Sequence, residues 1–593
     1  MQNLKSQTED YLLGLVSNVF ADIAQNFPKL KRSLSRDLET VRSRVSHEGV
    51  SFITKTMPKL DKAIVTAIET GKLTRPKEFR KSHGCKEIPA FMSGILSCLF
   101  HDSGEFNMEC NRILLRDVRT LLRVGYKTEV PYTKAQEQAV FDRFVENESI
   151  LNSLVLDVNE PLLQSARKIV GTIFRDFNPR DIFPRHGPGA VATSEWGNGK
   201  WRFKRLYRNL HSFYPYYEYF MVSGTRSLLD RVGWYRSLQR LDTGTAKVVL
   251  VPKDSRGPRL ISCEPLEYQY IQQGLGRAIV KRLESHWMSK GQVNFSDQSI
   301  NGQLALESSV TREYATLDMK DASDMVSLAL VRALFGGSLL SGLEAARTAA
   351  TTLPDGRVIE LSKYAPMGSA LCFPVEATVF FAICVAYLDG LGVRNAHTRV
   401  FVYGDDIIVP SEHASGLMTT LEKYGLTVNR DKSFVSGFFR ESCGVDAFKG
   451  TIVTPLRNKI PRVSGAQDAN SAASLVSLAN SFRRRSFENT ASFLFSHYRR
   501  TFGKLPHGTA RSPYLCEEGP SAFVALTRNL AEGWNVRWNP DTHSVSIRCR
   551  YLKSRPECDP IEDWERLLSG LLSGSESDPS LVVRPRSTQI SSG

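Results

Sequence analysis

The residues with the clearest chemical potential are two adjacent aspartates, Asp405 and Asp406, in the Gly-Asp-Asp triplet at 404–406. Short runs of β-branched and aromatic residues at 400–403 and 407–409 predict two strands joined by a tight hairpin turn. Both faces of the first strand carry apolar side chains, which indicates a hairpin buried in a larger sheet. A buried carboxylate needs a positive partner, and an all-oxygen ligand set suits magnesium or manganese.

A second carboxylate motif separates this interpretation from the alternative, in which the two aspartates form a solvated turn. Residues 314–317 are typical of a strand, and Asp318 stands at its exit. A helix is expected to begin around 321–323, where Asp and Ser can cap it. Asp318 and Asp405 are 87 residues apart, which is ample for two strands of one sheet to bring them together. Taken alone, this motif is more typical of an ordinary strand-to-helix turn with an N-cap Asp.

Three cations follow an apolar strand at 247–252. Lys253, Arg256 and Arg259 stand in and after a turn, and a second strand follows. Cations on one rigid hairpin are suited to holding a triphosphate, although a solvated loop is the common alternative. Lys247, at the start of the first strand, is a candidate RNA contact.

Aromatic and basic residues alternate at 201–208. Trp201, Arg202, Lys204 and Arg205 could stack bases and follow phosphates. The same pattern is typical of a partly buried strand with a charged outer face, and both alternatives stay open.

Composition favours a large enzyme with a polyanionic partner. The chain has 593 residues, is 41% hydrophobic and carries a formal net charge of +15. Such a length predicts several subdomains, and the excess charge suits RNA or DNA, although it also fits a merely basic soluble protein. No secretory signal is visible. The apolar run 377–388 is too short to span a bilayer and predicts a buried helix.

The ten cysteines form no Cys-x-x-Cys pair, which indicates reduced thiols in a cytosolic protein. A loose group could ligate zinc, but its spacing matches no standard zinc module. Its members are His83, Cys85, Cys98, His101 and Cys110.

Helical periodicity is expected over 1–75 and over most of 110–180, and a further helix at 414–424. Residues 573–593 are rich in Ser, Pro and charge and are expected to form a disordered tail.

Taken in order, the motifs resemble those of the replicase β subunits of single-stranded RNA bacteriophages, the leviviral RNA-directed RNA polymerases. The resemblance is strongest over about 247–450 and covers several motifs in the family's order. They are 294–301 (Asn-Phe-Ser-Asp-Gln-Ser-Ile-Asn), 315–324, Met367-Gly368, 403–408 and 439–444 (Phe-Arg-Glu-Ser-Cys-Gly).

The resemblance implies an α+β right-hand polymerase with fingers, a palm made of an antiparallel sheet flanked by helices, and a helical thumb. The corresponding regions are 1–240 for a mostly helical N-terminal region and fingers, 241–445 for the fingers and palm core, and 446–572 for the thumb, before the tail at 573–593.

The resemblance also implies roles for individual residues. Two Mg²⁺ ions, which Mn²⁺ can replace, would be held by the aspartates at 318, 405 and 406. The other implied roles are triphosphate binding by Lys253, Arg256 and Arg259, ribose sensing by Asp324, nucleotide contact by Gly368 and Ser369, and proton donation to pyrophosphate by Lys432.

The implied partners are an RNA template and product, ribonucleoside triphosphates, host translation elongation factors and a ribosomal protein. The implied location is the cytoplasm of a bacterial host cell, with no membrane. Two positions depart from many relatives, because Ser369 and Cys372 stand where Asn and Thr are common. The second Asp of the 315–324 motif also sits six positions after the first, as in the phage family, instead of the five common elsewhere.

Two other functions remain as alternatives. A reverse transcriptase would share the fold, but such enzymes usually carry a bulkier residue where Gly404 stands. A catalytically silent RNA-binding protein would be expected to have lost some of its aspartates, whereas all three are present.

Overall fold

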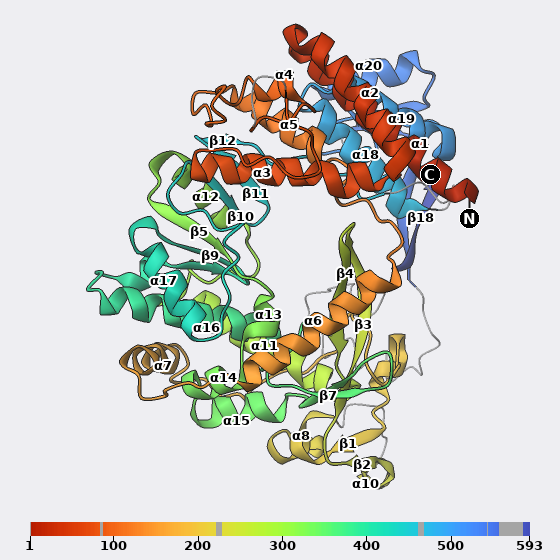
Figure 1. Cartoon of the computed structure of the whole chain (residues 1–593). Helices are drawn as coiled ribbons and strands as arrows, with labels where there is room; N and C mark the ends of the chain where they lie inside the picture. Colours follow the sequence, from red (N-terminus) through yellow and green to blue (C-terminus); the bar gives the residue numbers. More distant parts are fainter. Residues whose placement is uncertain are drawn as a thin grey trace.

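The computed structural model describes residues 2–82, 87–220, 228–460, 468–541, 544–556 and 585–592. Helices and several small sheets are mixed along the chain (Figure 1). The sequence-based prediction of an α+β protein is confirmed at this level. The three sheets that matter most for the site have the strand orders β5-β9-β8, β4-β3-β6-β7 and β10-β11-β12.

The sheet β5-β9-β8 carries the candidate metal ligands. Strand β9 (Asp406–Pro410) lies between β5 (Tyr314–Asp318) and β8 (Phe401–Tyr403) and is antiparallel to both. The register places Asp318 opposite Asp406. The centre of β9 is fully buried. The predicted hairpin and the predicted position of Asp318 at a strand exit are both confirmed.

Two helices pack against this sheet. Helix α16 (Cys372–Gly390) contacts β8, and α17 (Ser411–Lys423) contacts β9 and β5 (Figure 1). Helix α16 is long and apolar enough to cross a membrane by length and composition, but 78% of its most apolar window is buried inside the protein. It is therefore a core helix here, as the sequence predicts.

The cationic hairpin belongs to a second sheet. Strands β3 (Thr245–Asp254) and β4 (Gly257–Cys263) are antiparallel, and β6 (Ala350–Thr352) extends the sheet toward β7 (Val358–Glu360). Helix α6 (Lys134–Asn152) runs beside this hairpin (Figure 1). A capping box of Thr133 and Gln136 starts α6, and the Gln136 Nε2 donates to the Arg256 carbonyl at 2.6 Å. The start of α6 thus fastens the tip of the hairpin.

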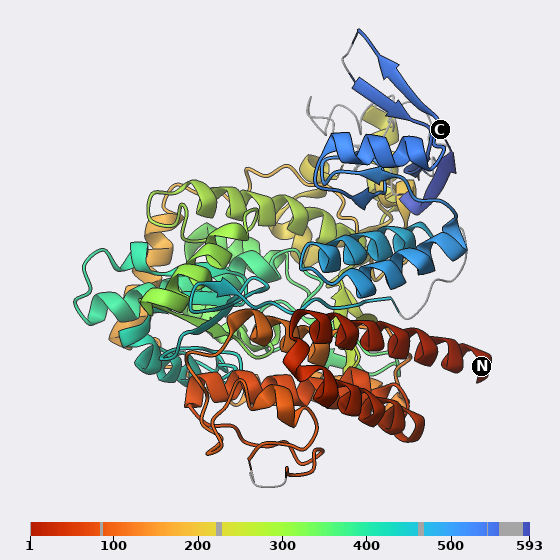
Figure 2. The same cartoon turned by 90° about the horizontal axis from the view of Figure 1, so that it is seen from above.

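The N-terminal helices share one hydrophobic core with elements between residues 434 and 505. Helices from the N-terminal region pack with a C-terminal helical pair and with β10–β12, so that residues between 11 and 124 meet residues between 434 and 505 (Figures 1 and 2). These elements are α1 (Gln2–Asn26), η1 (Pro28–Leu30), α2 (Lys31–Glu48), η2 (Phe52–Thr56), α3 (Met57–Thr70), α4 (Ser93–Leu96), α5 (Arg112–Arg123), β10 (Phe439–Ser442), β11 (Val445–Phe448), β12 (Thr451–Ile452), α18 (Ala469–Arg483) and α19 (Glu488–Phe502).

A second core lies between residues 163 and 428 and surrounds α16. Its further elements are α7 (Pro161–Ile173), η3 (Gly197–Trp201), β1 (Arg205–Tyr207), α8 (Arg208–Phe213), α9 (Tyr216–Tyr219), α10 (Leu228–Ser237), β2 (Gln239–Leu241), α11 (Leu266–Ser285), α13 (Ala322–Met325), α14 (Leu328–Leu334), α15 (Gly337–Ala345) and η4 (Ala396–Arg399). Helix α12 (Ser299–Thr311) contacts β10, β11 and β5. The helices predicted over 1–75 and 110–180 are confirmed. The boundaries at 240 and 445 stay predictions, although the cores divide the predicted segment 1–240 between them.

The C-terminal part contains short sheets at the edge of the molecule (Figure 2). They are formed by β13 (His507–Gly508) with β14 (Glu517–Glu518), β15 (Val536–Asn539) with β16 (Ser544–Ile547), and β17 (Arg550–Pro556) with β18 (Pro585–Ser592), beside α20 (Ala522–Ala531). The predicted disorder of 573–593 is wrong for 585–592, because this segment pairs antiparallel with β17 and so satisfies its backbone groups. Residues 573–584 and 593 lie outside the described residues.

The sequence-based zinc hypothesis rests partly on residues outside the described part of the chain, since His83 and Cys85 lie there. Cys98 is exposed and Cys110 is buried, and both are free thiols. Burial raises the pKa of the Cys110 thiol to about 11, which keeps it protonated.

Candidate active site

The three aspartates singled out by the sequence line one cavity. Asp318, Asp405 and Asp406 enclose a space of about 150 Å³ together with Lys432 and Glu441. Asp405 is exposed at the hairpin tip, whereas Asp318 and Asp406 are half-buried. The strands are thus buried as predicted, but the turn between them opens onto the cavity.

Gly404 is required by the hairpin. Its φ is +60°, and a Cβ there would lie 1.9 Å from Cε2 of Phe373 on α16. Any other residue would displace that ring or the turn. The absence of a side chain at Gly404 therefore allows α16 to pack closely against the aspartate turn.

The cavity is electrostatically unfavourable for its own carboxylates. Burial raises the pKa of Asp318, and Lys432 and Asn429 only partly offset it. Burial and the neighbouring Asp405 raise the pKa of Asp406 to about 6. Because anions crowd a site of reduced solvent access, a cation entering the cavity would relieve both effects.

Asp318 is oriented by the loop that follows α17. Asn429 Nδ2 donates to Asp318 Oδ2 at 2.6 Å, and the Asp318 backbone N–H donates to Ser433 Oγ at 3.1 Å. Lys432 Nζ lies 3.5 Å from Asp318 Oδ1. Burial lowers the pKa of Lys432, but Glu441, Asp318 and Asp406 outweigh it and raise that pKa. Lys432 therefore lies beside the aspartates, and its role as a proton donor stays a prediction.

An N-terminal helix holds the next part of this loop. Glu69, near the end of α3, accepts hydrogen bonds from the backbone N–H groups of Val435, Ser436 and Gly437 at 2.8–3.1 Å. Lys62 on the same helix pairs with Asp431 at 2.7 Å. The loop that positions Asp318 is thus itself anchored by α3, which sequence reasoning had not connected with the site.

The motif at 439–444 supports Asp406 from another side. The Cys443 backbone N–H donates to Asp406 Oδ2 at 2.8 Å, from the turn between β10 and β11. Arg440 is fully buried and donates to the carbonyls of Tyr314, Gly437, Phe439 and Val435, so it ties β10 to the start of β5.

Glu441 is a site residue that sequence reasoning quoted within a motif but gave no role. Its side chain lines the carboxylate cavity, and burial raises its pKa. One signal in the sequence could have identified Glu441. It is an acidic residue within the 439–444 motif, in a strand whose other residues are buried, and Asp446 follows five residues later.

The donor set fits a magnesium ion. Among the described residues, no three His, Cys, Asp or Glu side chains converge closely enough to enclose an ion by themselves. Mg²⁺ usually takes one or two carboxylates and completes its shell with water and substrate phosphates. An open, all-oxygen cavity with crowded anions therefore matches Mg²⁺ better than a closed zinc site would.

The cations predicted to bind triphosphate lie together on the β3–β4 hairpin, but they differ. Arg256 is committed to Asp254, with Nη2 to Oδ2 at 2.8 Å and the Arg256 backbone N–H to Oδ1 at 2.9 Å. Lys253 and Arg259 are exposed, and burial and Arg259 lower the pKa of Lys253. Lys247, at the other end of β3, is also exposed.

Asp324 lies in α13 and is neutralised inside the protein. Its Oδ1 is 2.7 Å from the Lys363 Nζ, which is fully buried and also 3.0 Å from Glu148 Oε1. The ammonium sits 3.7 Å above the Phe144 ring of α6. The predicted side-chain cap of this helix is wrong, because Asp321 adopts φ +52° and pairs with Arg143 instead.

Gly368 and Ser369 form a turn that is anchored to β4. Gly368 has φ +124°, and a Cβ there would lie 2.1 Å from the Ser262 carbonyl oxygen. The Ser262 backbone N–H donates to the Met367 carbonyl at 2.8 Å. Ser369 is buried, and its Oγ accepts from the Leu371 N–H at 3.3 Å. Their contact with a nucleotide stays a prediction.

The segment 201–205 favours the structural alternative for its aromatic residues. Trp201 packs edge-on against His186 at 4.5 Å between ring centroids, and Phe203 is buried. Arg205 pairs with Glu195 at 2.9 Å. Arg202 and Lys204 are exposed. The predicted RNA contacts of Trp201, Arg202, Lys204 and Arg205 stay predictions.

Comparisons with known proteins bear on this site. The RNA replicase, beta-chain family matches residues 201–488. The RNA-directed RNA polymerase subunit beta of Qbeta virus (strain MX1) is 32% identical over 315 residues, which are 51% of this chain and 50% of that protein. The corresponding subunit of Enterobacteria phage SP is 38% identical over 36% of each chain. The RNA-directed RNA polymerase beta chain of Escherichia phage MS2 is 38% identical over 36% of this chain and 38% of its own.

These matches span at most half the length of the relatives. Among solved structures, the BmCPV RNA-dependent RNA polymerase at elongation state covers 83% of this chain and 48% of its own, at 12% identity and a TM-score of 0.40. The resemblance predicted from the sequence motifs is confirmed by the sequence relatives.

Proposed function

We infer that this chain, whose residues 201–488 match the RNA replicase, beta-chain family, is an RNA-directed RNA polymerase. It would copy a phage RNA genome from ribonucleoside triphosphates. The observation that carries this inference is the single cavity shared by Asp318, Asp405 and Asp406, with Lys432 at its edge. All four residues lie in the matched span, and the three aspartates come from the motifs at 315–324 and 403–408.

The aspartates at 318, 405 and 406 would hold two Mg²⁺ ions, with Mn²⁺ as a substitute. When bound, such ions activate the 3′-hydroxyl and stabilise charge on the leaving pyrophosphate. The protein's own part is orientation: Asn429 fixes one oxygen of Asp318, and the Cys443 N–H fixes one oxygen of Asp406. These bonds hold the carboxylates at the cavity before a substrate arrives, which lowers the reorganisation needed during reaction.

Lys432 is suited to donate a proton to the leaving pyrophosphate. Its raised pKa keeps the ammonium charged until a stronger base approaches. Lys253 and Arg259 are exposed cations of the β3–β4 hairpin and would clamp the incoming triphosphate. Arg256 would act chiefly through its bond to Asp254, by holding the hairpin tip in shape.

The proposed polymerase architecture follows from the same parts. The β5-β9-β8 sheet with α16 and α17 would be the palm, the β3–β4 hairpin part of the fingers, and the α18–α19 pair the thumb. Host translation elongation factors and a ribosomal protein are proposed partners, and the cytoplasm of the bacterial host is the proposed location.

A template-directed synthesis assay tests this function. The purified chain is given an RNA template with ribonucleotides or deoxyribonucleotides, in Mg²⁺ or Mn²⁺, with and without a host cell extract; Asp405→Asn is the matched control. We expect a labelled RNA complementary to the template from the wild type alone. Incorporation of deoxyribonucleotides in preference to ribonucleotides would indicate a reverse transcriptase. No product under any condition, from a chain that still binds RNA, would indicate a silent binding protein.

A further inference from the structure

Glu441 is a fourth carboxyl group of the carboxylate cavity, and the proposed mechanism gives it no part. Its side chain lines the cavity together with the three aspartates and Lys432. The Glu441 backbone N–H donates to Thr316 Oγ1 at 3.3 Å, which ties β10 to β5 at this point. The strand register places Glu441 directly opposite Asp446 on β11, so two carboxylates stand side by side on one hairpin. Each of them needs a cation.

Asp446 already has its cation. Asp446 Oδ2 lies 2.7 Å from Nη2 of Arg119, and both side chains are buried. The same guanidinium pairs with Asp61 through Nε at 2.9 Å and donates from Nη1 to the Val453 carbonyl at 3.2 Å. Arg119 is thus held between two carboxylates. In the described part of the chain, by contrast, the Glu441 carboxylate forms no salt bridge.

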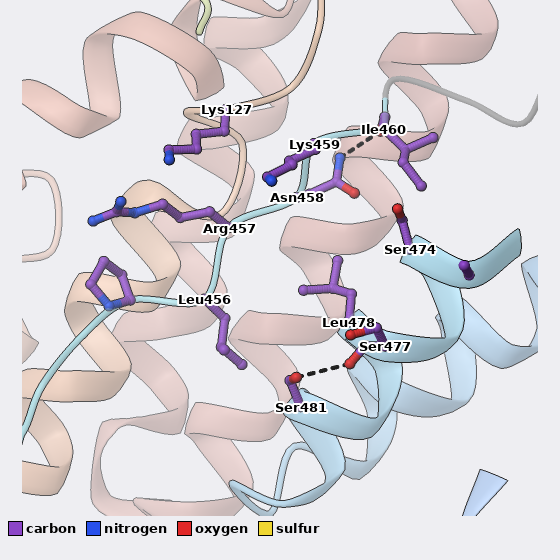
Figure 3. Close-up of a pocket in the computed structure, with 12 residues that line it drawn as sticks. Lys127, Leu456, Arg457, Asn458, Lys459, Ile460, Ser474, Ser477, Leu478 and Ser481 are labelled. Carbon is purple, nitrogen blue, oxygen red and sulfur yellow. Dashed lines mark hydrogen bonds between the residues drawn. The ribbon is translucent and has the colours of Figure 1, made fainter. Parts of the chain in front are cut away.

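Arg457 is a nearby cation that lies outside the carboxylate cavity. It belongs to the extended segment that, with α18, lines a separate cavity of about 510 Å³ (Figure 3). Figure 3 shows its side chain extending away from α18. Burial lowers the pKa of Arg457, and among the carboxylates that oppose this effect Asp446 comes before Glu441. Arg457 is therefore a cation of the Asp446 cluster and not the partner of Glu441.

Lys432 shares the cavity with Glu441. Its Nζ lies 3.5 Å from Asp318 Oδ1, beyond the roughly 2.7–2.9 Å of a hydrogen-bonded ion pair. Burial lowers the pKa of Lys432, and of the carboxylates that raise it Glu441 comes before Asp318. Burial and Asp446 raise the pKa of Glu441, and Lys432 is the first of the cations that oppose them. The ammonium is thus attracted by two carboxylates of the cavity and held tightly by neither.

We propose that Glu441 is a positioning residue, which holds the Lys432 ammonium at the cavity when Asp318 binds a cation. Asp318 would then be neutralised, and the ammonium would lose its present partner and be repelled from it. Among the described lining residues, Glu441 is the carboxylate outside the three aspartates. Lys432 would shift from Asp318 to Glu441 and stay charged beside the leaving pyrophosphate. The proposal rests on the proposed function for this role of Lys432.

Mn²⁺ binding followed by electron paramagnetic resonance at about pH 8, without RNA or nucleotide, tests the proposal in a double-mutant cycle. In Glu441→Gln the ammonium has Asp318 as its remaining partner and competes with the cation there, so the Kd should rise about tenfold. Lys432→Met removes the competitor, and in that background Glu441→Gln should change the Kd by less than about twofold. Arg457→Met is the matched control, because it removes a cation outside the cavity; the full effect of Glu441→Gln should persist in it.

Two results would overturn the proposal. One is an unchanged Kd in a folded Glu441→Gln variant. The other is an equal rise in the Kd with and without Lys432, because Glu441 would then act on the cation directly. Circular dichroism and thermal melting check folding. If Glu441→Gln fails to fold, Glu441→Asp takes its place in the cycle, since it keeps the charge but withdraws it from Lys432; the same coupling to Lys432→Met is expected.

Single-nucleotide incorporation adds a readout that a purely structural role would not give. Glu441→Gln should lower kcat at least about tenfold with KM and RNA affinity nearly unchanged, and it should cause little further loss in Lys432→Met. An equal loss of kcat in both backgrounds would also contradict the proposal. Because Mn²⁺ binding is measured without synthesis, an inactive wild type that still shows the coupling would refute the polymerase proposal alone.

Discussion

Asp318 and Asp324 stand six residues apart on one strand–helix unit, yet their surroundings differ in charge. Asp318 faces two more aspartates in a shared cavity, and its pKa is raised by burial. Asp324 faces the buried ammonium of Lys363, which Glu148 and the Phe144 ring also contact.

The difference shows what residue type alone does not reveal. The protein balances Asp324 with its own cation, so this carboxylate is held in place as part of the structure. Among the described residues that line the cavity, the half-exposed Lys432 is the one cation, whereas three aspartates and Glu441 carry carboxyl groups. Bound cations can supply the remaining charge balance, which is the reason to expect metal ions at Asp318 and none at Asp324.

The largest expected effect is on the rate of synthesis, and it should distinguish the cavity aspartates from Asp324. Asp405→Asn and Asp318→Asn should lower synthesis at least about 10³-fold, because an amide cannot hold the cations. Asp324→Asn should retain measurable synthesis. Single-nucleotide incorporation at saturating RNA measures this, with RNA affinity as the control that stays unchanged. Near-normal synthesis by Asp405→Asn would contradict the proposal that the hairpin aspartates bind the metal ions.

The next effect concerns stability. Lys363→Met leaves the buried Glu148 and the partly buried Asp324 without their partner and should destabilise the fold by about 3–5 kcal/mol. Lys432→Met is the matched control, because its side chain is 48% exposed, and it should change stability by less than about 1 kcal/mol. Urea unfolding compares the two; equal midpoints would mean that the Lys363 pair contributes no more than a surface pair.

A smaller effect concerns the sugar. Asp324→Ala should reduce discrimination against deoxyribonucleotides by about tenfold while costing less in reaction with the correct substrate, because a hydrogen-bond acceptor for the 2′-hydroxyl is lost. The ratio of kcat/KM for matched ribo- and deoxyribonucleotides measures it. A folded, active variant with an unchanged ratio would exclude sugar sensing by Asp324.

The last effect is the pH dependence of the stabilisation by Mg²⁺. Asp406 has its pKa raised to about 6, so its contribution to stability is present below its unfolded pKa and is lost as pH rises through about 6. A bound cation reverses this loss, and at 100 times its Kd it stabilises by about 2.7 kcal/mol. Mg²⁺ should therefore raise the Tm more at pH 8 than at pH 5. In Asp405→Asn the gain at pH 8 should shrink; an equal gain at both pH values in the wild type would contradict the link to these carboxylates.

Local pattern explains which parts of the site could be predicted. The Asp405–Asp406 hairpin and the strand exit at Asp318 could be predicted from short runs of apolar residues. The structure has its strands at those runs. Long-range contacts explain what was missed. Glu69 reaches the 435–437 loop from a helix more than 360 residues away, and Lys363 meets Asp324 from beyond α15.

Predictions from local pattern also failed where tertiary contacts competed. Asp321 was expected to cap a helix, but Arg143 on α6 attracts its side chain and the backbone turns left-handed. Residues 585–592 were expected to be disordered from composition, but a partner strand at 550–556 pairs with them. The aromatic residues at 201 and 203 were equally compatible with base stacking until the core contacts of Trp201 and Phe203 were seen.

Counting bound Mn²⁺ by electron paramagnetic resonance tests the central claim most directly, because it reads the cation site without substrate or turnover. At pH 7.5 the wild type should bind about two ions, and Asp324→Asn should bind the same number. Asp318→Asn and Asp405→Asn should each lose at least one ion or bind it far more weakly. Unchanged Mn²⁺ binding by Asp405→Asn, or its loss in Asp324→Asn alone, would contradict the assignment of the metal site to the β5-β9-β8 sheet.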